Sequence, residues 1–140
     1  MKKLSIIIVA LFLFFLIGAF MENGEKENAA EFEVVSVHDI TVKQGVNEKE
    51  FETFVINELA PIYNKMEGQN LTLVKGDRGI RTDKYAIILT FKSIQDRDRI
   101  YPPSGEFVGD FGADSIWNKF DSLVDDGLGA HHTDYVNVVQ

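Results

Sequence analysis

Three histidines are the side chains in this sequence best suited to chemistry near neutral pH, because imidazole titrates in that range. His38 lies in a run of β-branched residues, whereas His131 and His132 are adjacent near the C-terminus. The imidazole of His38 can act as a general acid or base, or bind a metal ion or a haem iron. His38 is therefore the candidate catalytic residue. The alternative, which the sequence favours, is a hydrogen-bonded histidine on a packed sheet.

The segment His131–Asp134, HHTD, contains two potential metal ligands in a row. Adjacent side chains at the entrance of a strand point to opposite sides, so at most one of the two histidines joins a site directly. We therefore expect no metal site in this segment. Convergence of His132 with His38 and with Asp39 or Asp134 would restore the segment as part of a site.

Tyr63 and Trp117 are aromatic residues that can line a cavity, although packing explains them as well. Together with His38 and His132 they are the candidate ligand-binding residues. We recognise no paired carboxylates, no Ser-His-Asp set and no nucleotide-binding motif, so the sequence leaves open whether the protein is an enzyme. We expect no cofactor and no bound metal.

The segment VKGDRGIRTDKYAIILTF (74–91) combines glycines and arginines in a way that has two interpretations. Arg78 and Arg81 could grip an anion, or the segment could be a plain β-hairpin. A phosphate-binding loop leads into a helix N-terminus, and here a strand follows instead. Gly76 and Gly79 also suit the positive φ angles of a tight turn. We therefore predict a hairpin, with the anion site as the alternative.

Composition and charge narrow the class of protein. The chain has 140 residues, a formal net charge of −8 and no cysteine. An acidic chain without a basic cluster is a poor partner for nucleic acid and for an anionic membrane surface. The absence of cysteine removes disulfides, thiolate nucleophiles and cysteine-ligated metal sites.

The first part of the chain is a targeting segment. Two lysines precede an uncharged apolar run, Leu4–Met21, that is about long enough to span a membrane. Residues 1–21 are therefore a signal peptide or a retained transmembrane anchor, and the sequence does not decide between them. Residues 22–31 are polar and acidic, which predicts a flexible linker. The positive N-terminus places a folded domain, 32–140, outside the cytoplasm, in the periplasm or cell envelope.

The rest of the chain alternates between strand and helix patterns. Asn47 is a capping residue before a helix that Pro61 should bend or split and that Gly68 should end. Asp114 is expected to cap the last helix. The resulting β-α-β-β-α-β order predicts an α+β, ferredoxin-like fold, an antiparallel four-stranded sheet with helices on one face and the second helix in two pieces. The predicted strands are 32–42, 71–75, 85–91 and 134–140, and the predicted helices are 47–66, 94–101 and one that begins at 114.

Both faces of the predicted sheet carry apolar residues. Along 85–91, four large side chains alternate with Ala86 and Ile88 on the other side. Two helices can cover only one face of this sheet. An exposed apolar face as large as the other one is unusual. A second copy of the same sheet would cover it, so we expect a homodimer.

The segment VHDITVKQGVNEKEFETFV (37–55), the strand YAIILTF (85–91) and the β-α-β-β-α-β order resemble the dimeric α/β-barrel superfamily. The resemblance covers about residues 32–140. It implies a barrel-like cavity between sheet and helices in each subunit. The superfamily includes small monooxygenases of the antibiotic-biosynthesis type, haem-degrading enzymes and stress-responsive barrel proteins.

The haem-degrading branch of that superfamily is expected to carry an Asn on the first strand, with a Trp and a His further on. Here the first strand carries His38, Trp117 lies on the last predicted helix, and His131 and His132 follow it. The catalytic pattern of that branch therefore does not map onto this chain.

These observations lead to one main functional hypothesis and two alternatives. The main hypothesis is an exported or membrane-tethered dimeric module that binds a small, partly apolar molecule. The first alternative is a cofactor-independent or haem-handling monooxygenase, with His38 as base or ligand and Trp117 near the substrate. The second is a structural protein of the cell envelope with a filled interior.

Overall fold

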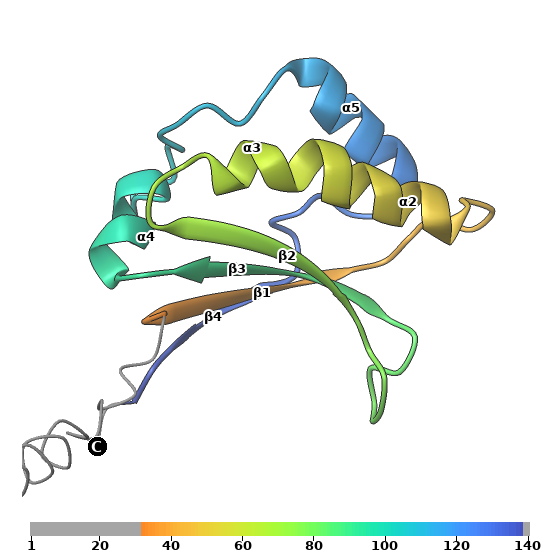
Figure 1. Cartoon of the computed structure of the whole chain (residues 1–140), viewed down its shortest axis with the longest axis horizontal. Coiled ribbons are helices and arrows are strands. Elements are labelled where there is room, and N and C mark those ends of the chain that lie inside the picture. Colours follow the sequence, from red (N-terminus) through yellow and green to blue (C-terminus); the bar gives the residue numbers. More distant parts are fainter. Residues whose placement is uncertain (1–31, 139–140) are drawn as a thin grey trace, which may run out of the picture.

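The base of the fold is a four-stranded antiparallel sheet, which lies below the helices in Figure 1. The computed structural model describes residues 32–138. The predicted signal peptide or anchor (1–21) and the linker (22–31) lie outside the described residues. The strand order is β2-β3-β1-β4. The strands are β1 (Val34–Ile40), β2 (Gln69–Lys75), β3 (Tyr85–Phe91) and β4 (His132–Val136).

The strands agree with the predicted ranges to within two residues, except at the outer end of β4. The predicted bounds of β3 are confirmed. β4 begins at His132, before the predicted 134–140, because His132 already pairs with His38 across the sheet. Its pairing with β1 reaches Val136, and residues 139–140 lie outside the described part.

The first helical segment is one continuous run with a wider turn in the middle. It comprises α2 (Glu48–Phe54), the π-helical turn η1 (Val55–Leu59) and α3 (Ala60–Asn64). Asn47 caps its start by accepting a backbone hydrogen bond. Pro61 lacks an N–H, and its ring would collide with the carbonyl four residues earlier, so the wider turn relieves this contact. The predicted cap at Asn47 and the split near Pro61 are both confirmed.

Two further helices follow β3, α4 (Ile94–Ile100) and α5 (Asp114–Leu123). Ser93 caps α4 by accepting a hydrogen bond from the backbone N–H of Asp96 at 3.0 Å. The predicted cap of α5 at Asp114 is wrong by one residue. The extended backbone that a cap requires is found at Ala113, which has no side-chain acceptor, whereas Asp114 is already helical.

The helices all lie on one face of the sheet, and the core lies between them and the strands (Figure 1). Every second residue of β1 and β3 is buried on this face, as the period of a strand requires. No helix within residues 32–138 has the length and apolar character needed to cross a membrane. The largest fully buried side chains are Phe51, Phe54, Phe91, Phe120, Leu59, Ile87 and Ile100.

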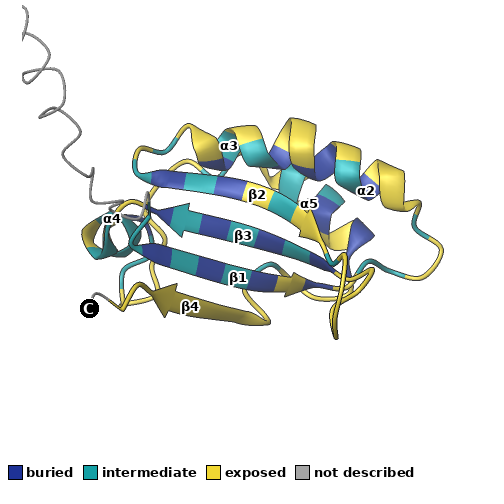
Figure 2. Ribbon diagram, turned by 60° about the horizontal axis from the view of Figure 1, so that its bottom comes forward, coloured by how far each residue is buried: buried dark blue, intermediate teal, exposed yellow. Residues whose placement is uncertain are grey.

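The opposite face, which we call the open face, has no helix over it (Figure 2). Its two central strands contribute a mainly apolar centre that is only half-buried, whereas the edge strands add several polar side chains. Val74 and Tyr135 extend the apolar surface to the two edges, so the second face is apolar but interrupted by polar side chains. The side chains of the open face are Val35, Val37, Asp39, Asn70, Thr72, Val74, Ala86, Ile88, Thr90, Thr133 and Tyr135.

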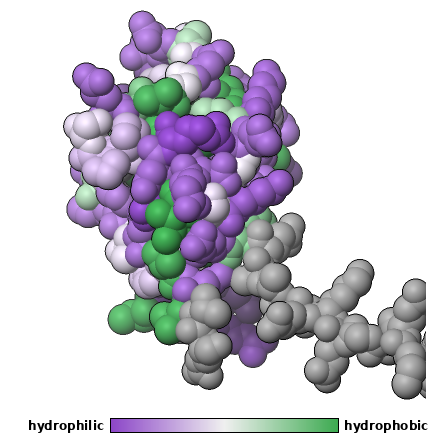
Figure 3. Space-filling view, turned by 90° about the vertical axis from the view of Figure 1, so that its left-hand side faces the viewer, coloured by the Kyte–Doolittle hydropathy of each residue, from purple (hydrophilic) through white to green (hydrophobic). Residues whose placement is uncertain are grey.

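The end of the domain that carries α4 is different. Figure 3 shows this end as mostly hydrophilic, with apolar side chains only in narrow strips between polar ones. A surface of this kind needs no partner to shield it from water.

The glycine- and arginine-containing segment is a β-hairpin between β2 and β3, as predicted. Gly79 has the expected positive φ of 92°. Gly76 has no positive φ. It is needed for a close approach instead, since a Cβ there would lie 1.8 Å from the Arg81 carbonyl oxygen. Arg78 pairs with Asp77 at 3.2 Å and Arg81 pairs with Asp39 at 2.6 Å. Each guanidinium thus already has a carboxylate partner in its own chain.

The missing cap of α5 gives a stability prediction. Ala113→Ser should raise the free energy of unfolding by about 1 kcal/mol, because the hydroxyl can accept a free N–H of the first turn. Asp114→Ser, one residue inside the helix, should give no gain. Urea unfolding of both variants measures the difference, and equal effects would show that Ala113 is not the capping position.

Candidate ligand-binding cavity

A cavity of about 460 Å³ lies between the sheet and the elements above it. Its floor is the helix-covered face of β1, β3 and β4, and its walls come from α3, α4, α5 and the segments on either side of α5. The hollow therefore lies within the fold, at the half of the sheet that the first helical segment covers least.

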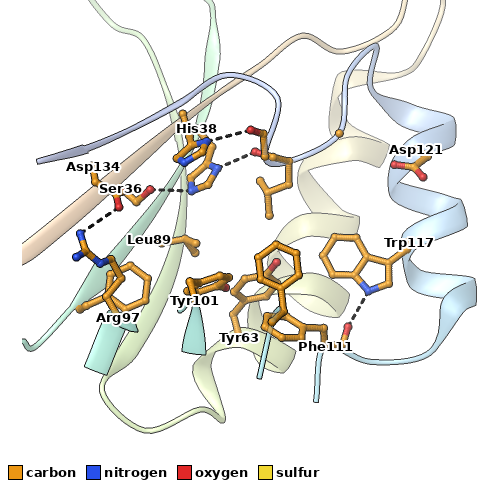
Figure 4. Close-up of a pocket in the computed structure, with 16 residues that line it drawn as sticks. Ser36, His38, Tyr63, Leu89, Arg97, Tyr101, Phe111, Trp117, Asp121 and Asp134 are labelled. Atoms are coloured by element: carbon orange, nitrogen blue, oxygen red, sulfur yellow. Dashed lines mark hydrogen bonds and ion pairs between the residues drawn. The ribbon is translucent and has the colours of Figure 1, made fainter. Parts of the chain in front are cut away.

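The floor of the cavity is polar because of the register between β1 and β4. Ser36 is paired with Asp134, and His38 is paired with His132. Residues that face each other across an antiparallel pair point to the same side, so all four side chains reach the cavity (Figure 4). Two strands from the two ends of the domain thus build one polar floor.

The opposite wall is aromatic. Tyr63 of α3 meets Phe111 at 5.8 Å and Trp117 of α5 at 6.3 Å, both in edge-to-face geometry. Tyr101 packs against Phe111 and Phe107 in the segment between α4 and α5. The indole N–H of Trp117 donates to the Phe111 carbonyl at 2.9 Å, so this N–H is already engaged within the protein and is not available to a ligand.

His38 is held in one tautomer. Its Nδ1 lies 2.7 Å from the carbonyl oxygen of Leu128, which can only accept, so Nδ1 carries the proton. In the neutral ring Nε2 is then an acceptor, and the Ser36 hydroxyl donates to it at 2.9 Å. Burial lowers the pKa of His38 below the usual 6.5. The hydrogen bond to Leu128 opposes this shift, nearby His132 adds to it, and the charge of Asp134 also opposes it.

His132 also bonds through its Nδ1 to a backbone carbonyl, that of the residue after Leu128. Its Nδ1 lies 2.9 Å from the Gly129 carbonyl oxygen, and its ring stacks on His38 with 5.1 Å between centroids and 14° between planes. Within residues 32–138 nothing hydrogen-bonds to its Nε2. The nitrogen available to a guest is therefore Nε2 of His132, since that of His38 is occupied by Ser36.

The charged groups of the cavity are largely paired with one another. Arg97 lies 2.8 Å from Asp98 and 3.2 Å from Asp134. Figure 4 shows the Arg97 side chain directed at Asp134, beside Ser36. Asp121, on the exposed side of α5, also lines the cavity. The one guanidinium in the lining is thus already matched by two carboxylates.

The structure brings the four candidate ligand-binding residues, His38, Tyr63, Trp117 and His132, into this single cavity. Their role in binding stays a prediction. His131 points elsewhere and pairs with Asp126 at 3.3 Å, as expected for adjacent histidines on a strand. Within residues 32–138 no cluster of three or more His, Cys, Asp or Glu side chains is arranged to hold a metal ion.

Sequence reasoning missed several lining residues. Ser36 could have been found, because it lies two residues before His38 and so shares its face. Arg97 belongs to a charged helical stretch whose pattern predicts a solvent-exposed face. Its contact with Asp134 is a tertiary contact, which the local sequence does not predict. Tyr101 is the C-terminal cap of α4, and Phe107 and Phe111 lie in the irregular segment after it, where no periodicity marks them as lining residues.

Comparison with known proteins identifies no relative: no protein-family model, no curated protein and no solved structure matches this chain.

The arrangement can receive a flat, mainly apolar guest. Rings in edge-to-face contact leave faces and edges free for a further ring, and the polar floor offers Nε2 of His132 as an acceptor with no partner among residues 32–138. His38 serves mainly to hold the loop at Leu128, because both of its ring nitrogens are already bonded.

The lowered pKa of His38 predicts a pH dependence of stability. The unfolded chain takes up a proton near pH 6.5, whereas the folded chain takes it up only at lower pH. The free energy of unfolding should therefore fall as the pH drops below about 6.5, and the fall should be smaller in His38→Gln.

Urea titrations at about pH 7 and about pH 5.5 measure this difference. His131→Gln, which removes an exposed histidine of the neighbouring segment, is the matched control. An equal pH dependence in wild type and His38→Gln would contradict the assignment.

Proposed function

We propose that this chain is an exported or membrane-tethered module that binds a small, partly apolar ring molecule in the cavity between its sheet and helices. The observation that carries the proposal is the cavity itself, with an aromatic wall facing two stacked imidazoles. A binding module needs a shaped, largely apolar pocket with a few polar groups that orient the ligand.

The size of the cavity supports binding over a purely structural role. The lining combines buried residues of β1 and β3 with exposed residues of β4 and of the segment between α4 and α5, so the hollow opens to solvent and a ligand can enter it. A hollow of about 460 Å³ lies within the range of about 300–1,000 Å³ that small-molecule sites occupy. A structural envelope protein would have no reason to retain it.

The monooxygenase alternative has less support. It requires His38 as a base or a ligand, and Nε2 of His38 is already occupied by the Ser36 hydroxyl. The haem-handling form of the alternative has a direct test. Haemin added to the protein should give no Soret shift, and a saturable shift that His38→Ala abolishes would restore this alternative.

The finer description of the fold is also part of the proposal. The strand order β2-β3-β1-β4 supports a ferredoxin-like arrangement. The apolar centre of the open face supports a homodimer in which two sheets pack face to face, around Val37 and Ile88. The lysines and apolar run of residues 1–21 support export, with the module outside the cytoplasm.

Ligand binding can be followed through Trp117, the single tryptophan of the chain. N-Phenyl-1-naphthylamine, a neutral dye that fluoresces in apolar sites, should give saturable energy transfer from Trp117. Leu128→Phe, which adds bulk to the lining, should weaken the dye by about tenfold. Ile80→Phe, at the exposed hairpin tip, should leave it unchanged. The absence of saturable transfer in the wild type would refute the proposed binding function.

The dimer has its own test in light scattering of the purified protein. Ile88→Lys places a charge at the centre of the open face and should raise the dimer dissociation constant at least about 100-fold, since a buried unpaired charge is costly. Ile56→Lys, on the exposed side of the first helical segment, should leave the dimer intact. A wild-type monomer at micromolar concentration would rule out this interface.

A further inference from the structure

We propose that the cavity selects an uncharged aromatic molecule with one hydrogen-bond donor. The O–H or N–H of this molecule donates a hydrogen bond to Nε2 of His132. This inference rests on the proposed ligand-binding function and names the chemical class of the ligand. Three observations carry it, namely the tautomer of His132, the pairing of the charges around it, and the geometry of the aromatic wall.

The tautomer makes His132 an acceptor. The Gly129 carbonyl at 2.9 Å holds the ring proton on Nδ1, so the neutral ring has its lone pair on Nε2. The stack on His38 restricts the rotation of this ring. His132 is exposed, so water can reach its Nε2, which has no hydrogen-bond partner among residues 32–138. A ligand that covers this nitrogen displaces the water, and a ligand with an O–H or N–H replaces the lost hydrogen bond, whereas one without a donor leaves the nitrogen unpaired at a cost in free energy.

The neighbouring imidazole cannot take this role. Nε2 of His38 receives the Ser36 hydroxyl at 2.9 Å, and its Nδ1 donates to Leu128 at 2.7 Å. His38 is also buried, with 7% of its surface exposed, and burial keeps it neutral. It therefore supplies neither a free acceptor nor a positive charge to the guest.

The charges around the site disfavour an ionic guest of either sign. An anion would need a free cation, and Arg97 is already bonded to Asp98 and Asp134. A cation at the polar floor would need a free carboxylate there, and Asp134 is already engaged by that same Arg97. The other carboxylate in the lining, Asp121, lies on α5, away from Asp134 (Figure 4). A charged guest would thus lose its hydration without a matching partner, whereas a neutral donor would not.

The aromatic wall sets the shape of the guest. Tyr63 is tilted by 71° to Phe111 and by 66° to Trp117, so the wall presents both ring edges and ring faces. A flat ring system between this wall and the polar floor of the sheet can add a further contact of the same kind (Figure 4). The hydrogen-bond donor of the ligand is then at the edge of the ligand's ring that points toward β4.

A matched set of naphthalenes tests the inference. 2-Naphthol carries the donor, 2-methoxynaphthalene replaces the donor hydrogen by a methyl group, and 2-naphthoate and 2-naphthyltrimethylammonium carry opposite charges. Binding is measured by equilibrium dialysis of the full chain in lipid nanodiscs, with empty nanodiscs as the blank. Naphthol should bind about tenfold more tightly than methoxynaphthalene, the increment of one good hydrogen bond, and both ions should bind more weakly still.

The matched variant is His132→Phe, which retains a ring to stack on His38 and removes Nε2. The ratio of naphthol to methoxynaphthalene affinity should fall to about one in this variant. His131→Phe, which changes the histidine directed away from the cavity, should keep the wild-type ratio.

The outcomes separate this inference from the function on which it rests. Equal binding of naphthol and methoxynaphthalene by the wild type overturns the inference and leaves the binding function standing. Tighter binding of either ion also overturns it. If the wild type binds none of the four compounds and also gives no energy transfer to the neutral dye, the binding function itself fails. The comparison of ligands on the wild type needs no variant, so an unstable His132→Phe does not prevent the test.

Discussion

The architecture of the cavity depends on two hydrogen bonds from histidine rings to consecutive carbonyls. His38 on the central strand β1 holds Leu128, and His132 on the edge strand β4 holds Gly129. Together they fix the segment that leads from α5 into β4, and this segment closes one side of the hollow. The bond from His38 spans 90 positions in the chain, so the site exists only after the sheet has formed. His38 is buried whereas His132 is exposed, so loss of the bond to Leu128 would leave a buried ring nitrogen without a partner, and loss of the bond to Gly129 would cost less.

The space between the sheet and the helices is close-packed in one half of the domain and contains the cavity in the other half. The distribution of large side chains explains this difference. Phe51, Phe54 and Phe120 are fully buried and fill the space where the first helical segment and α5 lie close to the sheet. Towards α4 the cover comes instead from an irregular segment. Tyr101 packs there on Phe91 of β3 at 5.8 Å and on Phe111, and these rings form one wall of the hollow. Close packing in one half can stabilise the domain while the other half stays open.

The two faces of the sheet have different energetic consequences. The helix-covered face provides the core and the cavity, whereas the open face exposes an apolar centre that helices of the described residues leave uncovered. Polar residues at the edge strands, such as Thr72 and Thr133, interrupt this apolar area, whereas Val74 of β2 and Tyr135 of β4 extend it to both edges. A partner that covers this centre would not obstruct the cavity, because the two lie on opposite sides of the same sheet. The cavity and the open face are thus spatially independent.

Local patterns in the sequence determined much of the fold. Alternation along 85–91 defines β3, Asn47 and Ser93 cap their helices, and Pro61 divides the first helical segment, because each effect acts within a few residues. The histidine and aromatic candidates also came from residue type alone. The tertiary structure decided what those residues form together. The register of β1 against β4 stacks His38 on His132, and the fold turns Arg97 toward Asp134. Register and cavity shape depend on contacts between distant segments, which no local pattern encodes.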